Sequence, residues 1–335
     1  MTDSILVTGG AGFLGSHVVD CLVQANANVI VLDDLSGGFR DNVHPAARFI
    51  QGSVVDAEQV DRIFDEHRIK YVYHLAAYAA EGLSHFIKRF NYQNNLIGSV
   101  NIINNCVRHD VECLVFTSSI AVYGSHQVPM REELTPQPED SYGIAKLAVE
   151  QELTATRRMF GLNHVIFRPH NVYGERQNIG DPYRNVIGIF MNQLMQDRPM
   201  TIFGDGTQTR AFTYVGDIAP VIARAHTTTG AYGQVFNVGA DTTCDLNRLA
   251  ERVAAAMRRP SHVTHLPARE EVAHAHSSHD KIRKFFDYPA ETTLDDGLHR
   301  MARWAESVGP RHGAPFAGIE IERNLPLSWR QITSA

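Results

Sequence analysis

This chain of 335 residues has few cysteines, no long apolar run and no excess of basic side chains. Its four cysteines, Cys21, Cys106, Cys113 and Cys244, show no paired spacing, which indicates reduced and mostly buried thiols rather than a disulfide framework. No apolar stretch approaches the roughly 18 residues that a membrane helix needs. Lys and Arg total 31 against 37 Asp and Glu, a net charge of -6, so nucleic acid is not an expected partner.

The N-terminus leads into a predicted strand by residue 4, which leaves no room for a signal peptide. With the reduced thiols and the missing membrane span, this predicts a soluble cytoplasmic protein. Hydrophobic residues make up 44% of the chain and charged residues 20%, values typical of a soluble enzyme. The length suits one large α/β domain with a second, smaller domain.

Short apolar runs alternate with longer amphipathic stretches through the first half of the chain. The pattern predicts buried parallel strands over 5–8, 29–32, 49–51, 71–75, 114–117 and 164–167. Helical patterns between them cover 57–67, 95–109 and 144–160. This alternation predicts an α/β fold with a doubly wound parallel sheet of the Rossmann type, whose ligands lie outside the carboxyl ends of the strands.

The regular alternation of strand and helix patterns ends after Arg168-Pro169. Residues 174–211 are expected to be rich in loops, with Pro182, Pro199 and Gly204-Asp205-Gly206 as turn residues. Strand and helix patterns return at 211–214, 217–226 and 235–238, and helical patterns follow at 246–257 and 294–307. We predict a large domain over 1–173, to whose sheet 211–240 crosses back, and a smaller C-terminal domain over 174–210 and 241–335.

A glycine-rich turn follows the first predicted strand. Gly9, Gly12 and Gly15 lie between that strand and a helix, where they permit a tight turn and leave room for a pyrophosphate at the helix N-terminus. Asp33-Asp34 ends the next strand, and a carboxylate there accepts hydrogen bonds from both ribose hydroxyls but repels a 2′-phosphate. The segment therefore favours NAD over NADP as the cofactor.

Tyr142 and Lys146 lie four residues apart, hence on one face of a predicted helix. A phenol beside a fixed positive charge is expected to have a lowered pKa and to act as a proton shuttle. Ser118-Ser119 ends the strand predicted over 114–117, at the sheet edge where the substrate should lie. Ser119, Tyr142 and Lys146 therefore predict hydride chemistry on an alcohol with a nicotinamide cofactor, and we take all three as catalytic.

At these residues the chain resembles the extended short-chain dehydrogenase/reductase family, specifically its nucleotide-sugar epimerases and dehydratases. The resemblance covers nearly the whole chain. It is carried by Thr8-Gly9-Gly10-Ala11-Gly12-Phe13-Leu14-Gly15, His74-Leu75-Ala76-Ala77, Asn94-Asn95, Ser118-Ser119-Ile120-Ala121-Val122-Tyr123-Gly124, Tyr142-Gly143-Ile144-Ala145-Lys146, Arg168-Pro169-His170-Asn171-Val172-Tyr173-Gly174 and Gly204-Asp205-Gly206-Thr207-Gln208-Thr209-Arg210.

The resemblance implies one set of residues for each ligand. The expected cofactor-binding residues are Gly9, Gly12, Phe13, Leu14, Gly15, Asp33, Asp34, Ser36, Gly37, Ser53, Val54, Leu75, Ala76, Ala77, Asn95, Ser118, Tyr142, Lys146 and Pro169. The residues expected to bind a nucleotide sugar are Ser119, Tyr142, Asn171, Asn185, Arg210 and Arg269. Arginine forks and amides suit the oxygens of a diphosphate.

The residues after Ser119 separate the reactions of this family. Similar 4,6-dehydratases have Asp-Glu there, and GDP-mannose 3,5-epimerases have a cysteine at the position of Ala121. Ile120-Ala121 can serve neither reaction, so the resemblance favours C4 epimerisation of the UDP-glucose/UDP-galactose type. In that reaction Tyr142 removes the O4 proton, NAD takes and returns the C4 hydride, and a transient 4-keto sugar turns over in between.

Other functions stay open at this point. One is a nucleotide-sugar dehydrogenase or reductase that releases its product after a single hydride step. Another is an epimerase for UDP-glucuronate or for a GDP-, ADP- or dTDP-sugar. A non-catalytic NAD-binding regulator has no use for Ser119, Tyr142 and Lys146 together and is the weakest of the three.

Departures from the family pattern concern both ligands. Many relatives have an aspartate where this chain has Ser53, so the contact to adenine is weakened or moved to Asp56. Arg269 is followed by Glu270-Glu271-Val272, not by the aspartate of relatives that bind UDP-galactose, which leaves the nucleobase open. The residue beside C2 of the sugar is Ala275 or His276.

Two further expectations concern a metal and an oligomer. His274, His276 and His279 have a spacing that invites a metal site, but they lie in a predicted loop without a fixed scaffold, so no metal is expected. The helices predicted over 95–109 and 144–160 are expected to form the seam of a homodimer, by analogy with relatives.

Overall fold

A parallel sheet of seven strands forms the centre of the computed structural model, which describes residues 3–125, 128–269, 271–313 and 316–333. The strands lie in the order β11-β6-β5-β4-β1-β2-β3. Their bounds are β1 (Ser4–Thr8), β2 (Val29–Asp33), β3 (Arg48–Gln51), β4 (Ile69–His74), β5 (Cys113–Thr117), β6 (Asn163–Pro169) and β11 (Gln234–Val238). Each neighbouring pair is parallel, which confirms the doubly wound sheet and the return of the chain to it through β11.

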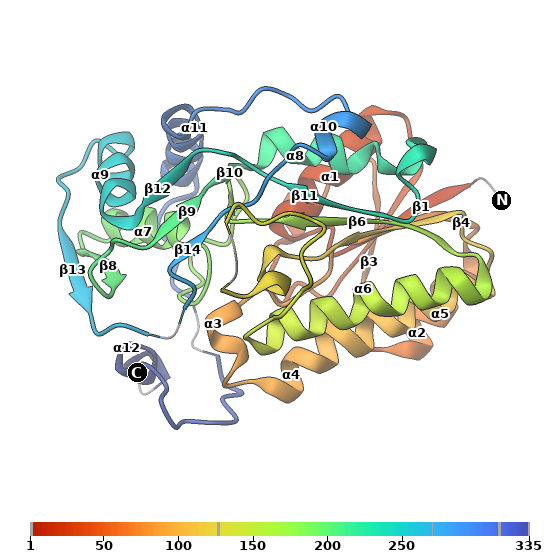
Figure 1. Ribbon diagram of the computed structural model, residues 1–335, viewed down its shortest axis with the longest axis horizontal. Helices are drawn as coiled ribbons and strands as arrows, with labels where there is room; N and C mark the ends of the chain where they lie inside the picture. Colours follow the sequence, from red (N-terminus) through yellow and green to blue (C-terminus); the bar gives the residue numbers. More distant parts are fainter. Residues whose placement is uncertain (1–2, 126–127, 270, 314–315, 334–335) are drawn as a thin grey trace.

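Helices cover both faces of this sheet (Figure 1). On one face lie α1 (Phe13–Gln24) and α8 (Val215–Ala223), and on the other lie α2 (Ala57–Glu66), α5 (Gly98–Arg108) and α6 (Ser141–Phe160). Every residue of β1, β2 and β5 is buried, because both faces are covered. These strands are apolar along almost their whole length because helices cover both faces of the sheet.

The helix expected over 95–109 begins earlier than predicted. It starts as α4 (Lys88–Tyr92), widens into a π-helical turn over Gln93–Ile97 and continues as α5. In the π turn the Asn95 side chain accepts a hydrogen bond from the backbone N–H of Tyr78 (2.8 Å) and donates one to the Tyr78 carbonyl (3.1 Å). The extra residue of the turn thus places Asn95 against the segment after β4.

The stretch expected to be rich in loops contains more regular structure than predicted. It contains α7 (Val186–Met195), β8 (Met200–Phe203) and β9 (Thr209–Ala211), while β7 (Val172–Tyr173) lies directly before it and β10 (Thr213–Tyr214) directly after it. The turn residues Pro182, Pro199 and Gly204 lie between these elements. The closely spaced turn residues therefore lie in short connections between elements, not in one long loop.

Most of the remaining elements pack beside the sheet, at the left of Figure 1. They are α9 (Leu246–Ala256), β12 (Thr243–Asp245), β13 (Val263–Leu266), β14 (His274–Ala275) and α11 (Leu294–Val308), with the short helices α3 (Glu81–Ser84) and α12 (Leu327–Thr333). The short helix α10 (Ile282–Phe285) instead contacts β11, near the top of Figure 1. β13 pairs with β8, and β9 lies between β12 and β14. The helices predicted over 246–257 and 294–307 are confirmed as α9 and α11.

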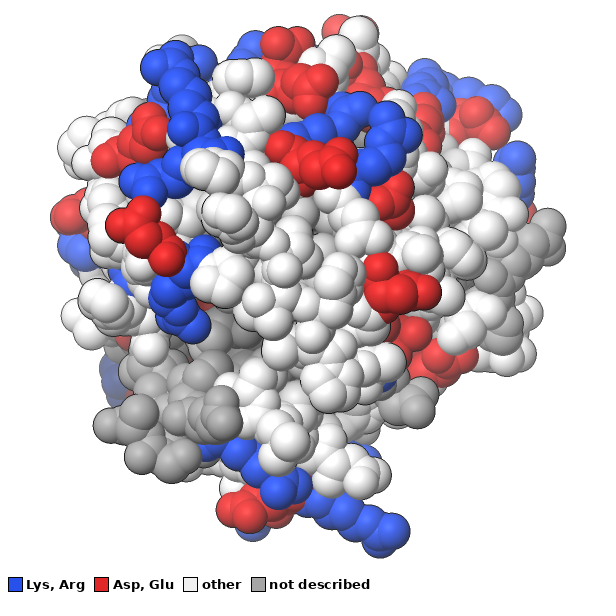
Figure 2. Space-filling view, turned by 90° about the vertical axis from the view of Figure 1, so that its left-hand side faces the viewer, with Lys and Arg blue, Asp and Glu red and all other residues white. Residues whose placement is uncertain are grey.

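The surface and the thiols match an ordinary globular protein. Lys, Arg, Asp and Glu are intermixed along the rim of the face shown in Figure 2. All four cysteines are free, and three of them are buried. Within the described ranges, no helix combines the length and the apolarity needed to cross a membrane.

Candidate active site

One cavity of about 1320 Å³ lies at the carboxyl ends of the central strands. It collects residues from the turns after β1, β2, β4, β5 and β6, and also from α7, β8, β9 and the segment around β14. Every cofactor- and substrate-binding residue predicted from the sequence lines this cavity except Asn95. Asn95 is buried behind the wall, where it fixes the backbone of Tyr78.

The glycine turn can be made only by glycine. Gly9 has φ +74°, and a Cβ there would lie 2.6 Å from the backbone nitrogen of Ala76. A Cβ on Gly15 would lie 2.0 Å from the carbonyl oxygen of Gly9. Gly12 forms the N-cap of α1 without a side-chain hydrogen bond, so backbone N–H groups at this helix end face the cavity. The arrangement fits a pyrophosphate.

Asp33 joins the glycine turn to the turn after β2. Its Oδ2 accepts a hydrogen bond from the Ala11 N–H (2.9 Å), and its Oδ1 accepts one from the Leu35 N–H (2.8 Å). Each carboxylate oxygen can accept a second hydrogen bond, as ribose hydroxyls require. Burial raises the pKa of Asp33. Asp34 is exposed at the cavity edge, where it accepts from the Ser36 N–H (2.9 Å).

Of the two residues considered for the adenine contact, only Ser53 borders the cavity. Asp56 is instead the N-cap of α2, where its carboxylate accepts a hydrogen bond from the Gln59 N–H (2.9 Å). The side chain beside the third strand is therefore a serine hydroxyl. With Ser53 in place of the aspartate of relatives, a weaker contact to adenine stays the prediction.

Helix α6 presents Tyr142 and Lys146 to the cavity. Asp140 caps the helix by accepting from the Gly143 N–H (2.9 Å). The Lys146 ammonium donates to the Thr117 carbonyl (2.9 Å) and lies 5.8 Å from the centre of the Tyr142 ring. Ser119, at the end of the turn after β5, accepts from the Ala121 N–H (3.1 Å) and faces the same space.

The electrostatics of this trio differ from the prediction in one respect. Burial raises the pKa of the Tyr142 phenol, against which a hydrogen bond with Ser119 acts. Burial also lowers the pKa of Lys146 to about 7, and the carboxylate of Glu150 only partly offsets that effect. The expected lowering of the phenol pKa is therefore wrong for the protein residues alone, because desolvation outweighs the nearby ammonium.

Ser118 is the other half of the serine pair. Its hydroxyl is buried, lines the cavity and has no hydrogen-bond partner among the described residues. A buried hydroxyl without a partner calls for a ligand group beside it. With the glycine turn and Asp33, it shows that the residues present fit a dinucleotide.

Two arginines, Arg210 and Arg269, also line the cavity. Arg210 donates to the carbonyls of Thr209 (2.9 Å), Ala273 (3.0 Å) and Val272. Arg269 pairs with Glu271 at 3.0 Å, and Arg210 lies 3.8 Å from the same carboxylate. The carboxylate following Arg269 that bridges both guanidinium groups is thus Glu271.

Glu270 lies outside the described residues. Asn171 and Asn185 also line the cavity, and both have left-handed backbone angles, with φ 41° and 65°. Asn171 donates to the Ala211 carbonyl at 3.3 Å, and Asn185 forms the N-cap of α7.

The structure adds charged residues that sequence patterns did not indicate. Glu81, Asp140 and Arg184 all line the cavity. Arg184 pairs with Asp181 at 2.6 Å and lies 4.8 Å from the centre of the Tyr78 ring. These residues come from a four-residue helix, a helix cap and a connection, and no motif marks them.

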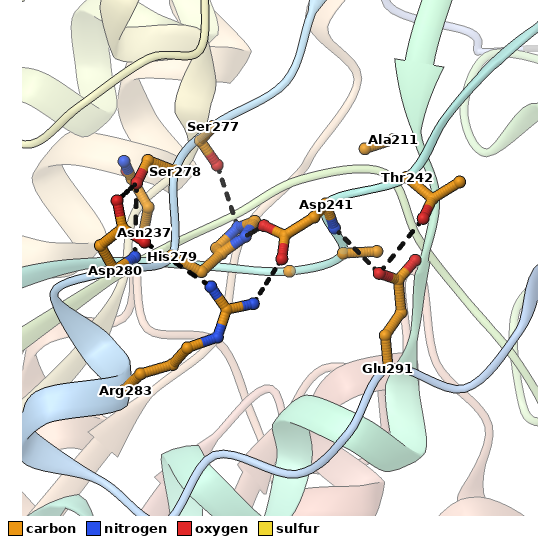
Figure 3. Close-up of polar contacts among 12 residues, drawn as sticks. Ala211, Asn237, Asp241, Thr242, Ser277, Ser278, His279, Asp280, Arg283 and Glu291 are labelled. Carbon is orange, nitrogen blue, oxygen red and sulfur yellow. Dashed lines mark hydrogen bonds and ion pairs between the residues drawn. The ribbon is translucent and has the colours of Figure 1, made fainter.

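A chain of polar contacts runs through His279 and Asp241 (Figure 3). His279 contacts Asp241 at 2.7 Å through Nδ1 and His170 at 3.1 Å through Nε2. The second oxygen of Asp241 accepts from Arg283. His170 in turn contacts the Ala211 carbonyl at 3.1 Å, which is also the acceptor for Asn171. The chain therefore runs from a half-exposed carboxylate to the cavity wall.

The three histidines considered as metal ligands do not converge. His274 contacts the Thr209 hydroxyl (2.8 Å), whereas His279 lies in the chain of polar contacts described above. Across the residues with a described position, no group of three or more His, Cys, Asp or Glu could hold a metal ion. Between the two candidates beside the sugar, Ala275 lines the cavity and His276 does not.

The sequence profile of the NAD dependent epimerase/dehydratase family matches residues 5–239. The chain belongs to this family. It is 32% identical over 330 residues to the UDP-glucose 4-epimerase of Azospirillum brasilense, with 91% of this chain and 92% of that protein covered. It is therefore an NAD-dependent nucleotide-sugar epimerase in the broad sense of the family, and NAD is its cofactor.

Solved structures give the same assignment. The UDP-glucose 4-epimerase of Thermotoga maritima, solved with UDP-glucose, matches with a TM-score of 0.84 and 32% identity over 92% of this chain and 99% of that one. The UDP-glucuronic acid 4-epimerase of Bacillus cereus, solved with UDP-glucuronic acid and NAD, matches with a TM-score of 0.81 and 25% identity over 92% and 100%. These relatives share the fold and differ in the sugar named for them.

Proposed function

We propose that this protein interconverts the C4 epimers of a UDP-hexose of the glucose/galactose type through a transient 4-keto sugar. The observation that carries the proposal is that one cavity is lined both by Ser119, Tyr142 and Lys146 and by Arg210 and Arg269. A hexose attached to a diphosphate needs such a pair of sites. The relatives named as UDP-glucose 4-epimerases support the choice of sugar.

The residues after Ser119 support epimerisation over dehydration. Ile120 and Ala121 line the cavity and offer neither an acid nor a base. A dehydratase needs both beside C5 and C6. Hydride chemistry confined to C4 requires only the groups that the trio supplies.

Each member of the trio has a separate role. Tyr142 accepts the O4 proton and later returns it, with the Ser119 hydroxyl sharing the same substrate oxygen. Lys146 is held by the Thr117 carbonyl, at the distance from the phenol where its charge can favour the phenolate. NAD, when bound, supplies the hydride acceptor and a further positive charge beside the phenol.

The substrate-binding residues hold the nucleotide. Arg210, Asn171 and Arg269 would bind the diphosphate and its nucleoside, and Asn185 would close the cavity at the start of α7. We propose the domain division on the same basis: 1–173 with 211–240 binds NAD, and 174–210 with 241–335 binds the nucleotide sugar. The cytoplasmic location stays a prediction from the sequence.

A homodimer is also part of the proposal. Among the described residues, four of the eight large hydrophobic side chains that are exposed lie on the α5–α6 side, namely Ile97, Ile144, Met159 and Phe160. Apolar side chains gathered on two neighbouring helices are typical of a helical interface. A second copy of the chain would cover them.

Proton NMR of the purified protein with UDP-glucose, without added NAD, tests the reaction. We expect UDP-galactose to appear with no accumulation of NADH. Build-up of NADH would instead indicate a dehydrogenase, and a 4-keto-6-deoxy product would indicate a dehydratase. Either of these results would overturn the proposal.

A further inference from the structure

Glu81 is a carboxylate in the active-site cavity for which the proposed reaction has no use. It is the first residue of α3, and its side chain borders the cavity together with Asp140 and Tyr142. The structure shows no hydrogen bond or ion pair from a described residue to this carboxylate. The Glu81 side chain is accessible within the cavity, so it can contact a ligand that binds there.

Hydrogen bonds fix α3 beside the catalytic phenol. The Ser84 hydroxyl accepts from the Tyr142 N–H (3.1 Å) and donates to the Glu81 carbonyl (2.6 Å). On its other side α3 approaches an arginine, since a Cβ on Gly82 would lie 3.7 Å from Nη1 of Arg269. Glu81 therefore lies between the group that would take the O4 proton and the group that would hold the diphosphate.

The sugar has to occupy that interval. Glu81 interacts electrostatically with Tyr142, Arg210 and Arg269, so a hexose bound by these residues would lie in the part of the cavity that Glu81 also lines. The two arginines already share Glu271. A bound diphosphate adds negative charge beside these arginines, so little positive charge is left to offset another anion near Glu81.

The charges around Glu81 support this interpretation. Burial and the carboxylate of Asp140 raise the pKa of Glu81 to about 7, while Arg210 and Arg269 act in the opposite direction. The group thus gains a proton more readily than an ordinary carboxyl. An additional anion brought next to it would be opposed further.

We propose that Glu81 determines the sugar: it accepts a hydrogen bond from a hydroxyl or N–H group of a neutral hexose, and it excludes hexuronates. The inference rests on the proposed function and names the substrate class of the same site. Specificity of this kind comes from a repulsive element as much as from an attractive one. UDP-glucose and UDP-glucuronate differ only at C6, so they isolate the effect of one carboxylate.

Calorimetric titration of the NAD-containing protein with UDP-glucose and with UDP-glucuronate at pH 8 tests the proposal. We expect the wild type to bind UDP-glucose at least about tenfold more tightly. Glu81→Gln keeps the size and an acceptor oxygen but removes the charge, so the preference should fall to about twofold or less. Glu81→Ser serves as a second variant should the first not fold, and Glu251→Gln, an exposed residue of α9, is the matched control that should keep the wild-type preference.

The outcomes separate the two proposals. Equal affinities in the wild type, or a preference unchanged in both Glu81 variants, would overturn the role of Glu81. A preference that depends on Glu81 without any C4 epimer in NMR spectra of the same samples would overturn the proposed function and leave the role of Glu81 standing. Failure of the wild type to bind either sugar would overturn both.

Discussion

Tyr142 is the residue on which the proposed reaction depends most directly. Tyr142→Phe removes one oxygen and leaves the ring packed as before, so the loss should fall on the proton transfer. We expect kcat to drop by about 10²–10⁴-fold, the usual contribution of a positioned acid or base. Binding of the nucleotide sugar, measured by calorimetry, should change little. Tyr92→Phe, outside the cavity, is the matched control, and a Tyr142→Phe enzyme with normal turnover would reject Tyr142 as the base.

For single residues, the sequence predicted which side chains line the cavity better than it predicted their electrostatic surroundings. Ser118, Ser119 and Gly9 belong to motifs whose order along strand and helix places them at the ends of strands. All three therefore line the cavity, as expected. The pKa of Tyr142 could not be predicted, because it depends on how completely the fold excludes water. Glu81 could not be predicted for a related reason, since only the packing of α3 on α6 brings it to the cavity.

At the scale of elements, a buried ion pair ties α6 to β6. Arg168 binds Glu150 through two nitrogens, Nε at 2.9 Å and Nη2 at 2.5 Å, and both side chains are at most 6% exposed. Arg168 also lies 4.7 Å from the centre of the Tyr123 ring. The pair therefore holds α6, which carries Tyr142 and Lys146, against β6, the strand that precedes Asn171.

Glu150→Gln would leave the Arg168 charge buried without a counter-ion. We expect the free energy of unfolding, measured by urea denaturation, to fall by about 3–5 kcal/mol. The matched control is Glu58→Gln, which breaks the exposed i,i+4 pair with Arg62 and should change stability by less than about 0.5 kcal/mol. Equal effects of the two substitutions would show that the buried pair contributes no more than a surface pair.

The chain of contacts through His279 makes a different prediction, for pH. His279 and Arg283 hold the pKa of Asp241 at about 2, below its ordinary value of 3.8. A pKa lowered by folding adds stability above pH 3.8, and this stability is lost as the pH falls towards 2. Asp241→Asn should therefore be less stable than the wild type at pH 6, and the gap should narrow as the pH falls from 5 to 3.

Urea denaturation across that pH range measures the gap. Asp110→Asn, at an exposed position that also has a left-handed backbone, is the control and should track the wild type at every pH. A gap that stays constant from pH 6 to pH 3 would mean that the Asp241 carboxylate is not what the contact stabilises.

Helices and strands could be predicted where the apolar residues follow a single pattern along the element. The central strands read as unbroken apolar runs because helices cover both of their faces, and α9 and α11 show clear amphipathic patterns. The π turn before α5 has no such signal, since it depends on Asn95 reaching the backbone of Tyr78. α7 was missed because its run, Val186–Met195, is apolar nearly throughout and lies among turn residues.

At the scale of the whole molecule, the cavity exists because the chain returns to the sheet. β11 joins the sheet beside β6, and the segments before and after it supply Arg210 and Arg269 to the cavity. Contacts such as His279 with Asp241 link the later segment to the end of β11. This topology thus brings Ser119, Tyr142 and Lys146 into one cavity with the two arginines. The side that carries α5 and α6 is the side where the dimer is proposed.

That side gives the last prediction. Ile97 is 50% exposed in the π turn before α5, so Ile97→Glu would place a charge in the proposed seam without touching the cavity. Light scattering after gel filtration should give the wild type twice the chain mass of 37.3 kDa and the variant a mass near 37.3 kDa. Val308→Glu, at a position 39% exposed at the end of α11 and away from α5 and α6 (Figure 1), should remain dimeric. A glutamate buried in the interface without a counter-ion opposes association by several kcal/mol, roughly the strength of a modest interface. A dimeric Ile97→Glu variant would therefore show that this turn is not part of the interface. A monomeric wild type would refute the dimer.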